Sequence, residues 1–123
     1  MRLGALYLAS GLTAIWGIAH LFATRGAVAG FGEISTDNRR VITMEWIVEG
    51  VALVTIGAFV AVATVLGLGS QVSSAVFAVA VAALLVLAIV SLFTGFRVPF
   101  LPYRLCPFIF ATSAVLIACG ALS

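Results

Sequence analysis

Four long apolar segments, separated by short polar connections, constrain this chain more than any other feature. An α-helix needs about 20 apolar residues to cross a hydrocarbon core of ~30 Å, and each segment reaches that length. Together they use most of the 123 residues and leave no room for a second domain. We therefore expect residues 1–123 to form one all-α domain, an integral membrane four-helix bundle built from two antiparallel transmembrane hairpins.

Composition excludes a soluble globular domain and a nucleic-acid-binding protein. Only 8% of the residues are charged, against roughly a quarter in soluble domains. The formal net charge of +2 is scattered and forms no basic stripe of the kind that binds nucleic acid. The six cationic residues are all arginine, and alanine, valine and glycine are abundant, which indicates a GC-rich bacterial genome.

The expected helix bounds follow from hydropathy and from helix-ending residues. The first apolar stretch is longer than the ~7–15 residues of a signal-peptide core, so we expect a retained helix. Prolines at the third connection should end the third helix, because proline cannot continue one. Pro107 should be tolerated near the start of the fourth helix, where backbone N–H groups have no helical partner. The expected helices span about residues 3–22, 39–66, 72–96 and 103–122.

Arginine distribution predicts the orientation in the membrane. With four crossings, the first and third connections share one side, opposite both termini. Cationic side chains favour the cytoplasmic side, and five of the six arginines lie near these two connections. We expect a multi-pass protein of the bacterial cytoplasmic membrane, with loops 1 and 3 in the cytoplasm and both termini outside. These arginines are Arg25, Arg39, Arg40, Arg97 and Arg104, against Arg2 alone on the other side.

Three ionisable residues lie within the apolar segments. His20 is on the first helix, and Glu45 and Glu49 are on the second. Ionisable residues are expensive to place in lipid and are candidates for function by default. The i,i+4 spacing of the two glutamates puts both on one helix face, where a carboxyl pair can share a proton. We expect Glu49, Glu45 and His20 to be catalytic, with roles as general acid and base.

Other polar and aromatic residues fall in the same half of the membrane. The antiparallel hairpin brings His20 and Glu45 level, since each lies ~7.5 Å along its helix from a loop arginine. We expect a pocket that opens to the loop side and is closed by apolar packing below. The candidate substrate-binding residues are Arg97, Arg104, Trp16, Trp46, Tyr103, Asp37 and Arg40.

The same residues also allow structural roles in place of catalytic ones. Glu45 can form a structural ion pair with His20, or Glu49 can form one with Arg97, and the tryptophans can anchor the helices at the membrane interface. No spacing typical of a metal site joins the two glutamates to His20, and a single histidine argues against haem, so we expect no metal and no cofactor. Cys106 and Cys119 lie ~20 Å apart on one helix, too far for a disulfide between them.

A family resemblance adds to this interpretation. The pattern Glu45-x3-Glu49-Gly50-x2-Leu53-x3-Gly57 on the second helix, with Gly4-Ala5-Leu6-x4-Gly11-Leu12 on the first, resembles the DoxX-like group of small membrane proteins. The resemblance implies a four-helix bundle and, in some members, a role as the membrane subunit of a quinone-linked oxidoreductase. It transfers no catalytic residue.

Three functions fit the sequence. The first is an acid-base enzyme, without a cofactor, that isomerises, cyclises or opens an epoxide in a lipophilic substrate such as an isoprenoid, sterol-like molecule, polyketide or quinone. The second is a noncatalytic subunit of a quinone-linked redox complex. The third is a proton-coupled transporter, which would require a homo-oligomer because four helices are few for a transport path.

Overall fold

The computed structural model describes residues 1–123 and contains four long helices. They are α1 (Arg2–Ala29), α2 (Thr36–Leu66), α3 (Gln71–Phe93) and α4 (Leu101–Leu122), with a 3-10 turn, η1 (Gly95–Arg97), between the last two. Each helix is long and apolar enough to cross a membrane. The expected all-α membrane four-helix bundle is confirmed.

The helix ends differ from the expected ones for local reasons. Helix α1 continues through Gly26 to Ala29, and the chain turns at Gly32, whose φ of 72° is left-handed. Helix α2 begins at Thr36 because the Ser35 hydroxyl accepts a hydrogen bond from the Asn38 N–H at 3.1 Å. Helix α3 ends at Phe93, earlier than expected, and gives way to η1.

Helix α4 corrects the expectation for Pro107. The helix begins at Leu101, so Pro107 lies in its interior and not in its first turn. A proline has no N–H, so Pro107 cannot bond the carbonyl of Tyr103 one turn earlier. The backbone ladder of α4 is therefore interrupted at Tyr103, a residue that lines the cavity described below.

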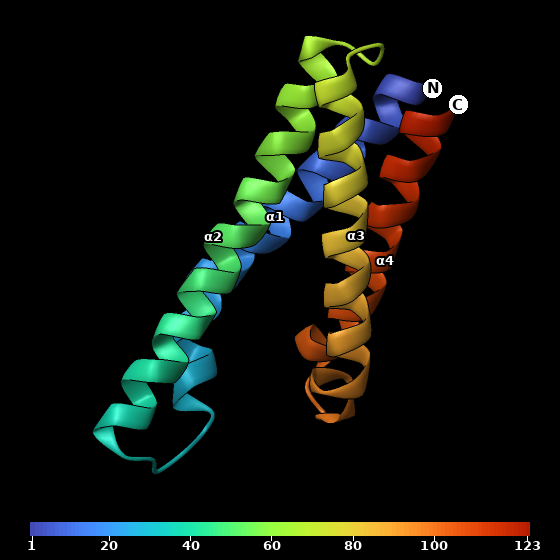
Figure 1. The fold of residues 1–123 in the computed structure, drawn as a ribbon. Helices are drawn as coiled ribbons and strands as arrows, with labels where there is room; N and C mark the ends of the chain where they lie inside the picture. Colours follow the sequence, from blue (N-terminus) through green and yellow to red (C-terminus); the bar gives the residue numbers. More distant parts are fainter.

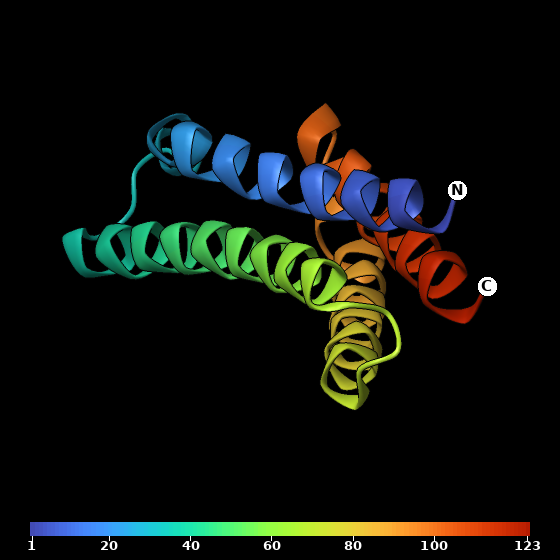
Figure 2. The ribbon, with the colours of Figure 1, turned by 90° about the horizontal axis from the view of Figure 1, so that it is seen from above.

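The two hairpins, α1–α2 and α3–α4, converge at one end of the molecule and diverge toward the other (Figures 1 and 2). We call the first the closed end: it holds both chain termini and the α2–α3 turn. The second, the open end, holds the α1–α2 and α3–α4 connections. The Arg2 guanidinium donates to the carbonyls of Gly120 and Ala121, both at 3.3 Å, and so ties α1 to the last turn of α4.

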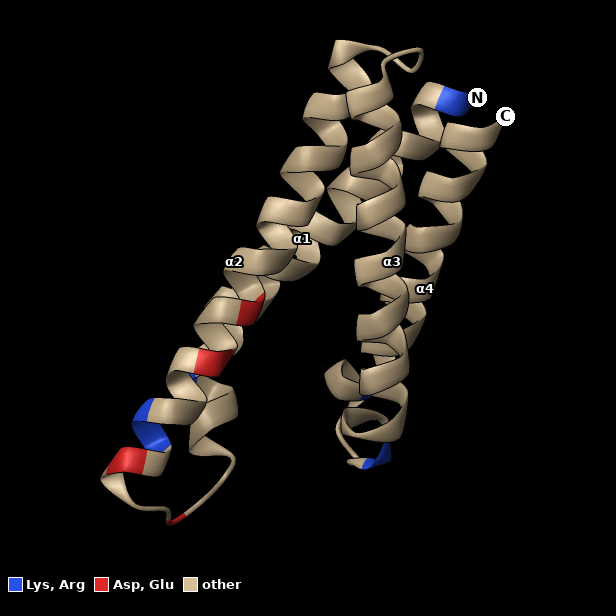
Figure 3. Cartoon of the chain, viewed as in Figure 1, with Lys and Arg blue, Asp and Glu red and all other residues tan.

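The apolar core lies toward the closed end. All four helices contribute to it, and its largest fully buried apolar side chains are Leu6, Leu53, Val60, Leu84, Phe110 and Ile117. On α3 the last buried residue is Ala88, so the core stops before the open end is reached. Charged residues show the opposite distribution: they gather toward the open end, and Arg2 alone lies at the closed end (Figure 3).

Candidate functional site

A cavity of about 780 Å³ lies between the two hairpins at the open end. This volume is within the ~300–1,000 Å³ of small-molecule sites. The α1–α2 hairpin contributes His20, Trp46 and Glu49, and the connection after α1 contributes Phe31. The opposite wall comes from α3 and α4 and is mainly apolar, with Leu87, Val90, Ser91, Thr94, Phe100, Tyr103 and Cys106.

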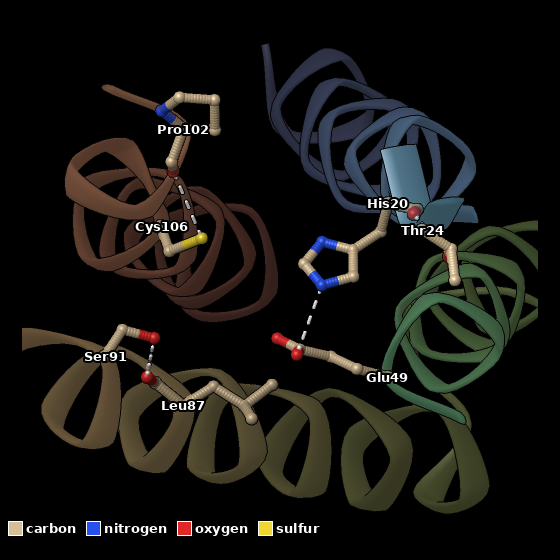
Figure 4. A network of polar contacts seen from close by, with 7 residues as sticks. All are labelled: His20, Thr24, Glu49, Leu87, Ser91, Pro102 and Cys106. Carbon is tan, nitrogen blue, oxygen red and sulfur yellow. Dashed lines mark hydrogen bonds and ion pairs between the residues drawn. The ribbon is translucent and has the colours of Figure 1, made fainter. Parts of the chain in front are cut away.

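His20 and Glu49 form the ionisable centre of this cavity (Figure 4). The Nε2 atom of His20 lies 3.2 Å from Oε2 of Glu49. The contact is close, but it lies outside hydrogen-bond geometry. The His20 side chain is only 8% exposed, whereas that of Glu49 is 40% exposed and reaches the cavity.

Two glycines explain why these side chains meet. Gly17 lies one turn before His20, and Gly50 directly follows Glu49. A Cβ atom built on Gly17 would lie 2.7 Å from the carbonyl oxygen of Gly50, which no real side chain allows. The absence of both side chains therefore lets the backbones of α1 and α2 touch at this level. The close approach brings His20 and Glu49 within reach of each other.

Aromatic rings extend from this pair toward α4. The imidazole of His20 stacks on the indole of Trp46, with ring centroids 4.2 Å apart and planes at 17°. Trp46 in turn faces Tyr103 at 5.8 Å, and Tyr103 meets Phe100 edge-on at 5.0 Å. The rings form a wall, which we call the aromatic wall, defined by His20, Trp46, Tyr103 and Phe100.

The hydroxyls on α3 have little proton-donating capacity left for a ligand. Ser91 donates to the carbonyl of Leu87, and Thr94 donates to that of Val90, each at 2.6 Å. Their free lone pairs still accept hydrogen bonds. Tyr103 lines both cavities, and a phenolic hydroxyl can donate as well as accept a hydrogen bond. The cavity thus offers an acid-base pair, one phenolic donor and two hydroxyl acceptors.

A second, smaller cavity adjoins the first. It has a volume of about 380 Å³, and more than half of its lining residues also line the main cavity, including His20, Trp46 and Tyr103. The residues that line only this second cavity come mainly from α1: Trp16, Ala19, Phe22 and Ala23. The indole N–H of Trp16 is buried there without a hydrogen-bond partner.

The structure brings together some of the predicted site residues. His20, Glu49, Trp46 and Tyr103 line the main cavity, and Trp16 lines the second. It corrects the expected carboxyl pair: Glu45 is exposed and lines neither cavity, so one carboxylate, not two, faces the site. The physical reason is that α2 diverges from α3 toward the open end, where Glu45 lies one turn beyond Glu49. A role for Glu45 stays a prediction.

The predicted polar anchors also lie outside the cavities. Arg97 and Arg104 are exposed, and the Arg104 guanidinium donates to the carbonyl of Val98 at 3.3 Å. Asp37 and Arg40 form an exposed ion pair of 3.7 Å within the first turns of α2. They lie on η1 and on the first turns of α2 and α4, and none of them lines a cavity.

Sequence reasoning missed several lining residues. Cys106 was considered only for a disulfide with Cys119, yet it lines both cavities and its thiol donates to the Pro102 carbonyl at 3.4 Å. Its position three residues after Tyr103, on the same helix face, was the available signal. No sequence pattern indicated Gly26 or Phe100, because neither residue is ionisable. Gly26 matters for the space that its missing side chain leaves, and Phe100 matters as part of the aromatic wall.

Comparisons with known proteins do not assign the chain to a family. No protein-family model matches it, and neither a curated protein nor a solved structure matches it significantly. The structure also brings together no three His, Cys, Asp or Glu side chains as a group that could hold a metal ion. The functional argument therefore rests on the geometry of the His20–Glu49 cavity.

Proposed function

We propose that this protein is a membrane-embedded acid-base enzyme that acts on a lipophilic substrate. One observation carries the proposal: an ionisable pair, His20 and Glu49, faces a largely apolar cavity of about 780 Å³ between transmembrane helices. The reactions that fit are isomerisation, epoxide opening and protonation-initiated cyclisation.

The energetic cost of the pair supports a functional role. Ionisable groups at membrane depth are costly to insert, and they persist mainly where they serve transport, binding or catalysis. A purely structural pair is better placed between packed helices, where both partners are enclosed. Here Glu49 keeps 40% of its side chain exposed and lines the cavity, so it is available to a ligand.

The pair can take a proton from the substrate and return one to it, so that the enzyme ends in its starting protonation state. In an isomerisation, the Glu49 carboxylate takes a proton from one carbon of the substrate, and the protonated member of the pair returns a proton to another carbon. Positioned acid-base groups of this kind contribute about 10²–10⁴-fold to a rate. In epoxide opening, Tyr103 gives its hydroxyl proton to the epoxide oxygen as the carbon–oxygen bond of the ring breaks. A water molecule, or a hydroxyl of the substrate, attacks the ring carbon and gives its proton to Glu49, which then returns a proton to Tyr103.

A second function is favoured by the aromatic wall. Stacked and edge-on rings at 4.2–5.8 Å suit a flat ligand ring, and the DoxX-like pattern of α1 and α2 points to quinone-linked redox complexes. In this alternative the protein is a noncatalytic quinone-binding subunit. The His20–Glu49 pair then hydrogen-bonds a quinone oxygen and transfers no proton in a catalytic cycle.

The proposal includes a location. We place the protein in the bacterial cytoplasmic membrane, with the open end and both of its connections on the cytoplasmic side, because five of six arginines gather there. Ser35→Cys, at the exposed start of α2, tests this orientation. A membrane-impermeant maleimide should label that cysteine only after the cytoplasmic face is opened.

The test of catalysis compares two glutamates on one helix. Apolar metabolites are extracted from host cells that carry the wild-type gene, a deletion, Glu49→Gln or Glu45→Gln. Each substitution removes a carboxylic acid and nearly conserves its shape, but only Glu49 lines the cavity. We expect the deletion and Glu49→Gln to accumulate the same apolar precursor, and Glu45→Gln to match the wild type, at equal amounts of inserted protein.

Two other outcomes of this experiment would contradict the proposal. If Glu49→Gln behaves as the wild type while the deletion does not, Glu49 is not an acid or base and the quinone-binding subunit becomes the better function. If Glu45→Gln accumulates the precursor as strongly as Glu49→Gln, the exposed carboxylate takes part and the one-carboxylate site is wrong.

A further inference from the structure

The charges around the two cavities limit the class of substrate. None of the six arginines lines either cavity. Four of them are engaged elsewhere: Arg2 with the end of α4, Arg104 with Val98, Arg39 with the carbonyl of Gly32 at 3.4 Å, and Arg40 with Asp37. The only acid-base pair in the lining is His20 with Glu49, whose Nε2 and Oε2 atoms lie 3.2 Å apart.

An anionic ligand would therefore meet the wrong environment. A phosphate or carboxylate placed beside Glu49 would lie next to a like charge, and the imidazole of His20 already faces that carboxylate. Burying a charge without a partner is far more costly than burying a hydrogen-bonded neutral group. The neutral oxygen of an alcohol, ketone, epoxide or quinone can use the same donors and acceptors at no such cost.

The second cavity shows where the rest of the ligand fits. It continues from the main cavity along the aromatic wall, and its separate lining is apolar apart from the indole N–H of Trp16. Gly26 lines both cavities, and a Cβ built on it meets no atom within 4 Å. This open position, which both cavities share, is therefore the candidate passage between the two spaces.

We propose that the substrate is an electrically neutral lipid whose oxygen function sits at His20 and Glu49 and whose apolar body passes Gly26 into the Trp16 cavity. This inference rests on the proposed function, because it assigns the substrate class of the same site. It narrows the expected substrates to uncharged ones and excludes isoprenoid diphosphates and fatty-acid anions.

The two tryptophans of the chain provide a direct measurement of binding. In the Trp46→Phe variant, Trp16 is the sole tryptophan and reports on the second cavity alone. The purified variant is placed in lipid nanodiscs and titrated with ω-bromododecanol or with ω-bromododecyl sulfate. The bromine at the apolar end quenches an indole on contact. The two probes share the same bromoalkyl chain, and their polar ends are a neutral hydroxyl and a bulkier, anionic sulfate.

We expect saturable quenching of Trp16 by the alcohol and an apparent affinity at least about tenfold weaker for the sulfate. Gly26→Leu, added to the Trp46→Phe variant, should abolish saturation because its side chain fills the passage. Gly11→Leu is the matched control: Gly11 lies on the same helix, its Cβ position is equally open, and it lines neither cavity. Quenching by probe dissolved in the lipid is linear and does not saturate.

The outcomes separate this inference from the proposed function. Equal affinity for the alcohol and the sulfate overturns the neutral-substrate inference, and the metabolite test of Glu49→Gln stands independently. Unsaturable quenching by the alcohol, or saturation that survives Gly26→Leu, overturns occupation of the second cavity. Saturable alcohol binding together with a wild-type metabolite profile for Glu49→Gln supports the ligand class and refutes catalysis.

Discussion

The same four helices are packed in two ways along their length. At the closed end, small residues bring backbones into contact, large apolar side chains fill the centre, and Ser10 bonds across helices to the Gly57 carbonyl at 2.7 Å. At the open end, the hairpins diverge, and the Ser91 hydroxyl bonds only to its own helix. The comparison shows that the chain concentrates its packing in one half and leaves the other half free to hold a ligand.

Replacing a glycine by leucine should produce the largest difference in stability between the two ends. At the closed end, a Cβ on Gly57 would lie 2.7 Å from the Ser10 carbonyl oxygen, so Gly57→Leu must push α1 and α2 apart. Overpacking costs about 1–3 kcal/mol and occasionally more, and we expect at least the top of that range. At the open end, a Cβ on Gly26 meets no atom within 4 Å, so Gly26→Leu should stabilise α1 by up to about 0.5–1 kcal/mol. Unfolding in mixed micelles with increasing SDS measures both, and equal effects would refute the division into two ends.

Leucine truncation should give a smaller contrast on α3. Leu84 is fully buried in the core, whereas Leu87, one turn closer to the open end, is partly buried and lines the cavity. Leu84→Ala should cost about 2 kcal/mol, the cavity component of such changes, because lipid supplies no transfer term. Leu87→Ala only enlarges an existing space and should cost under about 1 kcal/mol. The same SDS titration applies, and a costlier Leu87→Ala would mean that the open end is packed in the membrane.

The smallest contrast concerns two serine hydroxyls. Ser10→Ala removes an interhelical hydrogen bond and should cost about 0.6 kcal/mol, the average for such bonds in membrane proteins. Ser91→Ala removes a bond from a side chain to its own helix and should change stability by about zero, since such bonds slightly weaken a helix. Repeated titrations can resolve this difference, and a larger loss for Ser91→Ala would place Ser91 in an interhelical contact.

Much of the fold was predictable because lipid permits few solutions. The lengths of the apolar segments alone predict four helices. The bilayer core holds no water, so the backbone N–H and C=O groups of a spanning segment must hydrogen-bond to each other, as they do in a helix. Helix ends were less predictable: Ser35 caps α2 earlier than expected, and Pro107 fell inside α4 because the helix begins at Leu101. The resemblance to DoxX-like proteins stays a prediction.

The candidate site was predictable only in part. Membrane physics singled out His20, Glu45 and Glu49 alike, and placed His20 level with Glu45, whereas the structure puts His20 and Glu49 on one cavity. The i,i+4 rule placed Glu45 beside Glu49 on one helix face, but it contains no information on where neighbouring helices diverge. The contact of Gly17 with Gly50, which sets that geometry, depends on the pairing of two helices and cannot be read from either one alone.

The divergence of the hairpins also affects how any ligand of this cavity is measured. A space between transmembrane helices is in exchange with the acyl chains around it, so those chains are the competitors that a ligand displaces. The relevant concentration is then the mole fraction of ligand in the bilayer, not its amount per litre of buffer. Adding inert phospholipid at constant ligand should lower occupancy by simple dilution within the membrane plane, and affinities from different preparations agree only when expressed per lipid.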